Sequence, residues 1–201
     1  AQGCRETMTF SFISPKSYEK CRIDESERKS VEIMNPLGED TSVMRTSLIP
    51  SMMEVVARNI NNRTLSGRFF EIGREYHPVG DKNELPVEKE VLICTVYGDG
   101  EDFFTVKGIA EEVLGKCGVN PVFTALRSNR SFHTGRCAEI TAEGGKVIGV
   151  CGEIHPLAAE NYGIDKTRVY MLVIKLEELL ECSDSDVKYT CLLYTSDAAD
   201  E

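Results

Sequence analysis

Two arginines in strand-like segments are the side chains in this sequence best suited to bind an anion. Arg45 lies in SVMRTSL, a few residues before a proline that opens a helix, and Arg74 lies in FFEIGREY. A guanidinium on a sheet surface can hold a phosphate or a carboxylate through two parallel hydrogen bonds. The alternative is a buried or edge arginine that pairs with one of the 33 acidic residues of the chain. The sequence favours the ion pair and leaves the anion site open.

The other residues that could carry out chemistry form no catalytic pattern. His77 and His155 each precede a proline, which favours an extended or turn conformation at a strand end. Neither they nor His133 forms a nucleophile–base arrangement, so all three are interpreted as boundary residues. Glu111 and Glu112 are neighbours on a predicted helix, where adjacent side chains point to different faces. The sequence also lacks a GxxxxGK[ST] phosphate loop.

The cysteines do not have the spacing of metal ligands. No two form a CxxC pair, and none stands at metal-ligand spacing from a histidine, so we expect no metal site. Several lie in apolar strand-like runs, where a free cysteine behaves as a small hydrophobic residue. This usage indicates a reducing, cytoplasmic compartment. The eight cysteines are at positions 4, 21, 94, 117, 137, 151, 182 and 191.

Composition narrows the class of protein. The chain has 201 residues, of which 41% are hydrophobic and 28% are charged, as is usual for a globular domain. A net charge of -10 argues against broad nucleic-acid binding, which depends on clustered Lys and Arg. No apolar run reaches the roughly eighteen residues of a membrane-spanning helix. The first residues lack an initiator Met and the regions of a secretory signal, so we expect a fragment that begins inside a larger protein.

Residue patterns predict an α+β fold with an antiparallel sheet, because strand follows strand too often for a doubly wound parallel sheet. We expect the helices to lie against one face, although the apolar segment 91–98 should be covered on both of its faces. A Gly144-Gly145 turn predicts a hairpin. Strand-like segments are 7–14, 31–36, 42–48, 67–78, 91–98, 123–129, 136–155 (a hairpin) and 169–182, which ends in a short helical turn. Helices are expected from Pro50 to Asn62, with Met53, Val56, Ala57 and Ile60 buried, and over 102–117 and 156–163.

Five segments, in this order, resemble the beta subunit of bacterial phenylalanyl-tRNA synthetase: MNPLGEDTSVMRTSLIPSMMEVVARN, GRFFEIGREY, DFFTVKGIAEEVLGKCG, FHTGRCAEI and VIGVCGEIHP. The resemblance covers residues 5 to 190. It implies the C-terminal core module of that subunit over residues 1–190. The implied fold is that of a class II aminoacyl-tRNA synthetase, an antiparallel sheet flanked by helices.

The resemblance also implies that this module is a non-catalytic relative of the alpha subunit, which makes phenylalanyl-adenylate and charges the tRNA. Arg74 lies in FEIGREY, which resembles the segment around the arginine that binds the ATP alpha-phosphate in working class II synthetases. The residues that follow it lack the family's phosphate-gripping loop. A working site also needs a second arginine, which holds the ATP gamma-phosphate, on a late strand-to-helix element. Here that element is VIGVCGEIHPLAAENYG, which contains Gly149 and Gly152 but no arginine. Thr134 and Cys137 stand where the family pattern has a proline and a serine, which weakens any ligand role there.

The implied partners are an alpha subunit, in an alpha2-beta2 enzyme, and tRNA through the complete enzyme. No cofactor is expected on this segment, whereas the whole enzyme uses ATP and Mg2+. The rival hypothesis is a self-sufficient class II-like ligase or nucleotidyl transferase that uses Arg45 and Arg74. A further alternative is that the isolated fragment is only a partly stable domain, whose partner-facing side, including the helix that carries Met52 and Met53, exposes an apolar patch and favours aggregation. The expected interface or structural residues are Asn35, Arg45, Ser47, Met52, Met53, Glu71 and Arg74.

The end of the chain departs from the family pattern. Residues 191–201, CLLYTSDAADE, read like an in-frame translation of a sequencing-library adapter. We therefore expect a non-native tail there. The resemblance further implies that an editing domain and RNA-binding parts precede this module in the native protein, and that an anticodon-binding domain follows it.

Overall fold

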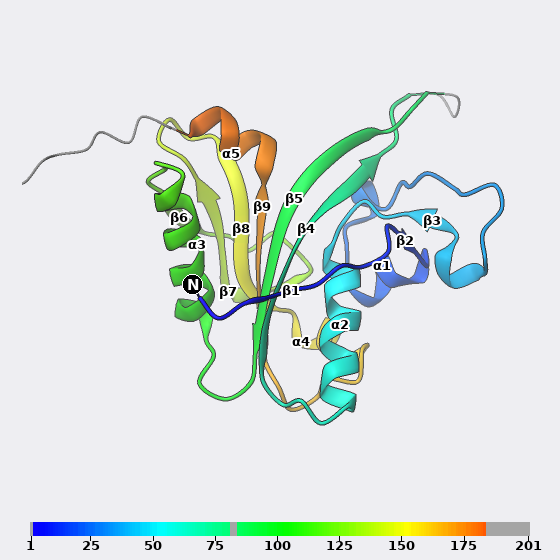
Figure 1. The fold of residues 1–201 in the computed structure, drawn as a ribbon, viewed down its shortest axis with the longest axis horizontal. Helices are drawn as coiled ribbons and strands as arrows, with labels where there is room; N and C mark the ends of the chain where they lie inside the picture. The colour runs from blue at the N-terminus through cyan, green and yellow to red at the C-terminus, as the bar shows by residue number, and fades with distance from the viewer. Residues whose placement is uncertain (1, 81–83, 184–201) are drawn as a thin grey trace, which may run out of the picture.

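The computed structural model describes residues 2–80 and 84–183 of the 201-residue chain. Its main element is a seven-stranded sheet in the order β1-β4-β5-β9-β8-β7-β6 (Figure 1). Every neighbouring pair is antiparallel except β1, which runs parallel to β4. The predicted α+β fold with an antiparallel sheet is confirmed. The strands are β1 (Arg5–Glu6), β4 (Gly67–His77), β5 (Val87–Tyr97), β6 (Val122–Ala125), β7 (Phe132–Thr141), β8 (Val147–Ile154) and β9 (Val169–Lys175).

The long strands lie at the predicted segments, although β5 and β7 each begin four residues earlier than predicted. β4 and β5 pair over their whole length, from Gly67 opposite Tyr97 to His77 opposite Val87. The predicted hairpin joins β7 to β8 through Gly144 and Gly145, whose φ angles are 97° and 83°. Glycine occupies these left-handed conformations without steric cost, and so the turn can be tight.

The first 48 residues form much less sheet than predicted. A two-residue ladder joins β2 (Phe12–Ile13) to β3 (Val43–Met44), and Glu32 adds a single bridge. The predicted strands over 7–14, 31–36 and 42–48 are therefore wrong in extent. Residues 8 to 13 keep the alternation of outward and inward side chains, but the inward Thr9 meets the Arg45 side chain instead of a neighbouring strand.

The helices begin and end at residues with clear local reasons. Asp102 caps α3 in a reciprocal pair of hydrogen bonds with Thr105, and Gly118 follows its end with a φ of 73°. Pro50 occupies the first turn of α2, where its missing N–H has no partner to lose. The helices are α1 (Lys16–Lys20), α2 (Ile49–Asn61), α3 (Phe103–Lys116), α4 (Pro156–Glu160) and α5 (Leu176–Cys182), with 3-10 turns η1 (Glu25–Glu27) and η2 (Glu39–Thr41).

Helices cover both faces of the sheet, so the expectation of helices on one face is wrong. Figure 1 shows α3 on one side of the strands and α2 and α4 on the other. Alternate residues of β5 divide between the two cores: Val91 and Ile93 pack with α2 and α4, whereas Cys94 and Val96 pack with α3 and α5. The physical reason is that the central strands are apolar on both faces, and each face must be removed from water.

Met52 and Met53 lie in the core, which corrects the expectation that their helix exposes an apolar patch. Both side chains are 0% exposed and pack in the same cluster as Ile93 and Met171. The face of α2 that carries them is turned to the sheet because that face supplies the sheet's apolar cover. Among the described residues, no helix has the length and apolar character needed to cross a bilayer. The expected tail, 191–201, lies outside the described residues.

Candidate functional site

Arg45 is enclosed in the protein interior, where it forms an ion pair with Glu71. It follows β3 directly, and its side chain is 2% exposed. The Nη2 atom lies 2.9 Å from Oε1 of Glu71, which points from β4 and is itself almost fully buried. A charge in such a site requires an opposite charge, because it has lost its hydration.

Further hydrogen bonds occupy the rest of the guanidinium. Nε donates to the carbonyl oxygen of Arg74 at 3.0 Å, and Nη1 donates to Oγ1 of Thr9 at 2.7 Å. The Thr9 hydroxyl in turn donates to Oε2 of Glu71 at 2.7 Å, so both carboxylate oxygens have a partner. The two charges are therefore satisfied within the chain, and the arrangement ties the segment before β2 to β4.

Gly73 makes room for this arginine. A Cβ atom at position 73 would stand 2.4 Å from Nη2 of Arg45 and 2.9 Å from Oε1 of Glu71. Gly73 lies two residues after Glu71 on β4, on the same face of the sheet. The glycine in FEIGREY thus has a packing role on the Arg45 side of the strand.

The same region fixes the turn into α2. The backbone N–H of Leu48 donates to Oε1 of Glu75 at 3.1 Å, and that of Ile49 donates to Oγ of the half-buried Ser47 at 3.3 Å. The N–H of Tyr76 donates to the carbonyl oxygen of Arg45 at 2.8 Å. Asn35, by contrast, is exposed in the loop between η1 and η2.

Arg74 points to the opposite face of β4 from Arg45. Side chains alternate along a strand, and Arg45 contacts the face that carries Glu71 and Gly73. The exposed Arg74 guanidinium pairs across the strands with Glu88 at 2.8 Å and Glu90 at 3.4 Å on β5. The hydrogen bond to Glu90 and the charge of Glu88 raise the pKa of Arg74. The two arginines therefore do not converge on one anion.

A second arginine–glutamate pair, which sequence analysis missed, borders a cleft of about 460 Å³ between α4 and the start of β9. Arg136 on β7 contacts both carboxylate oxygens of Glu153 on β8, with Nη2 3.0 Å from Oε1. Glu153 is 3% exposed, and its hydrogen bond raises the pKa of Arg136. The sequence could have predicted this pair. In a hairpin that turns at Gly144 and Gly145, residues equally distant from the turn face each other, which places Arg136 opposite Glu153.

Two of the three histidines, His155 and His133, accept a hydrogen bond from a nearby backbone N–H. Nδ1 of His155 accepts a hydrogen bond from the N–H of Leu157 at 3.1 Å and caps α4. Nδ1 of His133 accepts from the N–H of Gly135 at 3.0 Å. Within residues 2–80 and 84–183, no three His, Cys, Asp or Glu side chains come together as a metal site.

A groove with an apolar rim lies between the N-terminal segment and α2. Met8, Phe10 and Phe12, here called the apolar strip, are 92%, 80% and 42% exposed. The groove holds about 720 Å³, and Val55 of α2 is among the residues on its other side. Exposing large apolar side chains to water is unfavourable, and a group of them on one surface indicates an interaction site.

The sequence matches the family described as "Phenylalanyl tRNA synthetase beta chain CLM domain" over residues 1–176. The chain belongs to this family. It is 40% identical over 195 residues to the phenylalanine–tRNA ligase beta subunit of Clostridium acetobutylicum, which covers 96% of this chain and 24% of that protein. The subunit of the same name in Geobacter metallireducens is 37% identical over 200 residues, with 92% and 25% covered. The chain spans about a quarter of the length of these curated relatives.

A solved structure has a similar fold. The solved structure of a pyrrolysyl-tRNA synthetase from Desulfitobacterium hafniense superposes with a TM-score of 0.69 at 20% identity, covering 89% of this chain and 62% of that chain. At this identity the likeness establishes the fold alone. The predicted class II synthetase fold is thereby confirmed.

The glycines of the late strand-to-helix element in this CLM domain allow close strand packing. A Cβ at Gly149 would stand 2.3 Å from the carbonyl oxygen of Val173, and one at Gly152 would stand 2.6 Å from that of Arg136. Both obstacles are the backbones of neighbouring strands. Gly149 and Gly152 are therefore required by the sheet itself, independently of any ligand.

Proposed function

We propose that this chain is a non-catalytic module of the beta subunit of phenylalanine–tRNA ligase. It supports the ATP-dependent attachment of phenylalanine to tRNA by an alpha subunit, in a cytoplasmic alpha2-beta2 enzyme. The enclosure of Arg45 by Glu71, Thr9 and Gly73 carries this proposal. An adenylating site needs a cation that can reach the phosphates of ATP as their charge develops, and this guanidinium is already part of the core.

The arginines on the long strands support the same reading. Arg68, Arg74 and Arg136 each form an ion pair with a glutamate. At Arg68 and Arg136 a phosphate would have to displace a glutamate that is largely buried, and so a bidentate grip on ATP is disfavoured there. ATP and Mg2+ are accordingly assigned to the alpha subunit, and tRNA contact to the complete enzyme.

The alpha subunit is proposed to bind at the groove rimmed by the apolar strip. Met8 and Phe10 are the most exposed residues of the strip, and Phe12 is the first residue of β2. Protein interfaces combine an apolar centre with a charged rim, and Lys16 and Arg58 lie among the groove residues. Covering this surface would remove three large apolar side chains from water.

Phe10→Asp is expected to weaken binding of an alpha subunit roughly tenfold or more, because a carboxylate would have to be buried at the centre of the contact. Co-expression followed by affinity measurement at micromolar concentration tests this. Leu180→Asp is the matched control, since Leu180 is 71% exposed on α5 and should bind like the unsubstituted chain. Failure of the unsubstituted chain to bind any alpha subunit would contradict the scaffold role.

The rival, a self-sufficient ligase using Arg45 and Arg74, makes a different prediction. It requires the isolated chain to bind ATP with Mg2+ and to form an aminoacyl-adenylate. The scaffold proposal expects no heat of ATP binding in titration calorimetry and no adenylate with phenylalanine present. ATP binding that Arg74→Ala abolishes would favour the rival, whose weakness is that the two guanidiniums face opposite sides of β4.

A further inference from the structure

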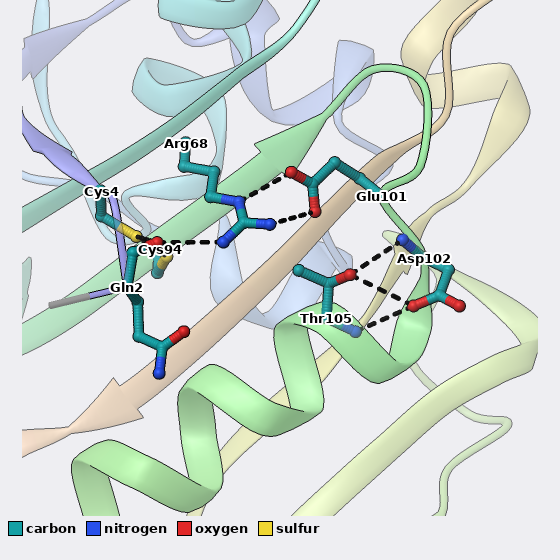
Figure 2. A network of polar contacts seen from close by, with 7 residues as sticks. All are labelled: Gln2, Cys4, Arg68, Cys94, Glu101, Asp102 and Thr105. Carbon is teal, nitrogen blue, oxygen red and sulfur yellow. Dashed lines mark hydrogen bonds and ion pairs between the residues drawn. The ribbon is translucent and has the colours of Figure 1, made fainter.

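Two cysteines that are far apart in the sequence meet beside the ion pair of Arg68 and Glu101 (Figure 2). The Sγ atom of Cys4, just before β1, lies 3.7 Å from Sγ of Cys94 on β5. Cys94 is 2% exposed, whereas Cys4 is only partly buried and can be reached from solvent. The two sulfurs need to approach by only about 1.7 Å to reach disulfide bonding distance.

Arg68 positions the more accessible thiol. Its Nη1 donates to the carbonyl oxygen of Gln2 at 3.0 Å, while Nε and Nη2 donate to the carboxylate of Glu101 at 2.7 Å and 3.1 Å. Figure 2 shows the guanidinium between Glu101 on one side and the segment of Gln2 and Cys4 on the other. The segment before β1 is thereby held over the sheet, with its thiol directed at Cys94.

The surroundings shift the pKa values of the two thiols in opposite directions. A hydrogen bond from Cys94 and the charge of Arg68 lower the pKa of Cys4 to about 7, against the opposing effects of burial and Glu101. The contact with Cys4 and burial raise the pKa of Cys94. A thiolate is the nucleophile in thiol oxidation, so Cys4 reacts first.

We propose that Cys4 is a peroxide-reactive thiol and that Cys94 is its resolving partner, so that the two form a reversible disulfide within the chain. The proposal is independent of the proposed function, because it depends only on the contacts of the Cys4 segment with β4 and β5.

The chemistry balances with hydrogen peroxide as the oxidant. The Cys4 thiolate attacks one peroxide oxygen, so that an S–O bond forms, the O–O bond breaks, and the hydroxide released takes up a proton to become water. The Cys94 sulfur then attacks the sulfenic sulfur of Cys4: the S–S bond forms, the S–O bond breaks, and the Cys94 proton leaves with the hydroxide as a second water. A dithiol such as dithiothreitol returns the pair to two thiols by exchange.

The bond would fix the edge of the sheet. β1 pairs with β4 through only two residues, Arg5 and Glu6, so a covalent bond at Cys4 would add a constraint to a short ladder. The disulfide closes a loop of about ninety residues, which restricts the unfolded chain strongly. We expect the oxidised chain to unfold at a Tm roughly 5–10 °C above that of the reduced chain.

The test exposes the chain to a small excess of hydrogen peroxide, alkylates the remaining thiols after denaturation and measures intact mass. Two fewer alkylatable thiols than the eight of the reduced chain are expected, together with a peptide that joins Cys4 to Cys94. Cys182→Ser, which removes another partly buried thiol, is the matched control and should still form the crosslink. Peroxide that oxidises Cys117 or Cys182 as fast as Cys4, or crosslinks other than Cys4–Cys94, would overturn the proposal.

Single variants separate the two roles. Cys94→Ser should accumulate sulfenic acid on Cys4 that dimedone traps, whereas Cys4→Ser should give no adduct on Cys94. Cys94→Ala serves if the serine is not tolerated in the core, with circular dichroism verifying the fold of each variant. The assignment is contradicted if Cys94 forms a dimedone adduct in the Cys4→Ser variant. It is also contradicted if Cys4 forms no adduct in either Cys94→Ser or Cys94→Ala.

Discussion

Replacing Arg45 with methionine is expected to lower the free energy of unfolding by about 3–5 kcal/mol. The substitution removes the guanidinium that lies 2.9 Å from Glu71, while the carboxylate stays in a site that is 4% exposed. A buried carboxylate without its counter-charge has lost hydration and gained nothing in return. Urea unfolding followed by circular dichroism measures the change.

Two further variants separate the buried pair from the loss of any arginine. Arg74→Met removes an exposed guanidinium from β4 and is expected to leave stability unchanged within the error of measurement. The double variant Arg45→Met with Glu71→Leu removes both charges, and is expected to be more stable than Arg45→Met alone. Equal losses in the two single arginine variants would show that the ion pair has no special role in the core.

Gly149→Ala is expected to destabilise the protein by about 1–3 kcal/mol or more. The added Cβ would lie 2.3 Å from the carbonyl oxygen of Val173 and 3.3 Å from Cα of Ile174. Both atoms belong to the backbone of β9, which cannot rotate out of the way as a side chain does. β8 and β9 must therefore separate where they pair, and thermal unfolding should show a lower Tm.

The matched control makes the same change where there is space. A Cβ at Gly108, within α3, meets no atom within 4 Å. Gly108→Ala is expected to stabilise the protein by about 0.5–1 kcal/mol, because alanine loses less backbone entropy in a helix. A loss of stability at position 108 as large as that at 149 would indicate that close strand packing is not the cause.

Elements with strong local signals could be predicted from the sequence. Asp102 and Gly118 bracket α3 because a cap and a left-handed residue act within one turn of the helix. The turn at Gly144-Gly145 likewise follows from the conformations that only glycine adopts easily. Apolar character over 91–98 indicated a strand buried on both faces, as β5 is. The first 48 residues were overpredicted as strands because alternation persists there without a neighbouring strand.

The candidate site was only partly predictable. The sequence raised Arg45 and Glu71 as candidates without pairing them. Whether Arg45 would meet an acid or an exogenous anion depended on Glu71, 26 residues away, and on the space left by Gly73. The pairing of Arg136 with Glu153 followed from hairpin register but was missed. No sequence signal indicated that Cys4 would meet Cys94, since they are 90 positions apart.

The sequence by itself determined the class of fold and the family, because ordered segments and hydrophobic periodicity survive in one dimension. Only the tertiary structure decided that Arg45 and Arg74 face opposite sides of β4, that Met52 and Met53 are core rather than surface, and that helices cover both sheet faces. The physical reason is that burial and charge pairing depend on which distant side chains approach within a few ångströms, and strand order and register alone establish those approaches.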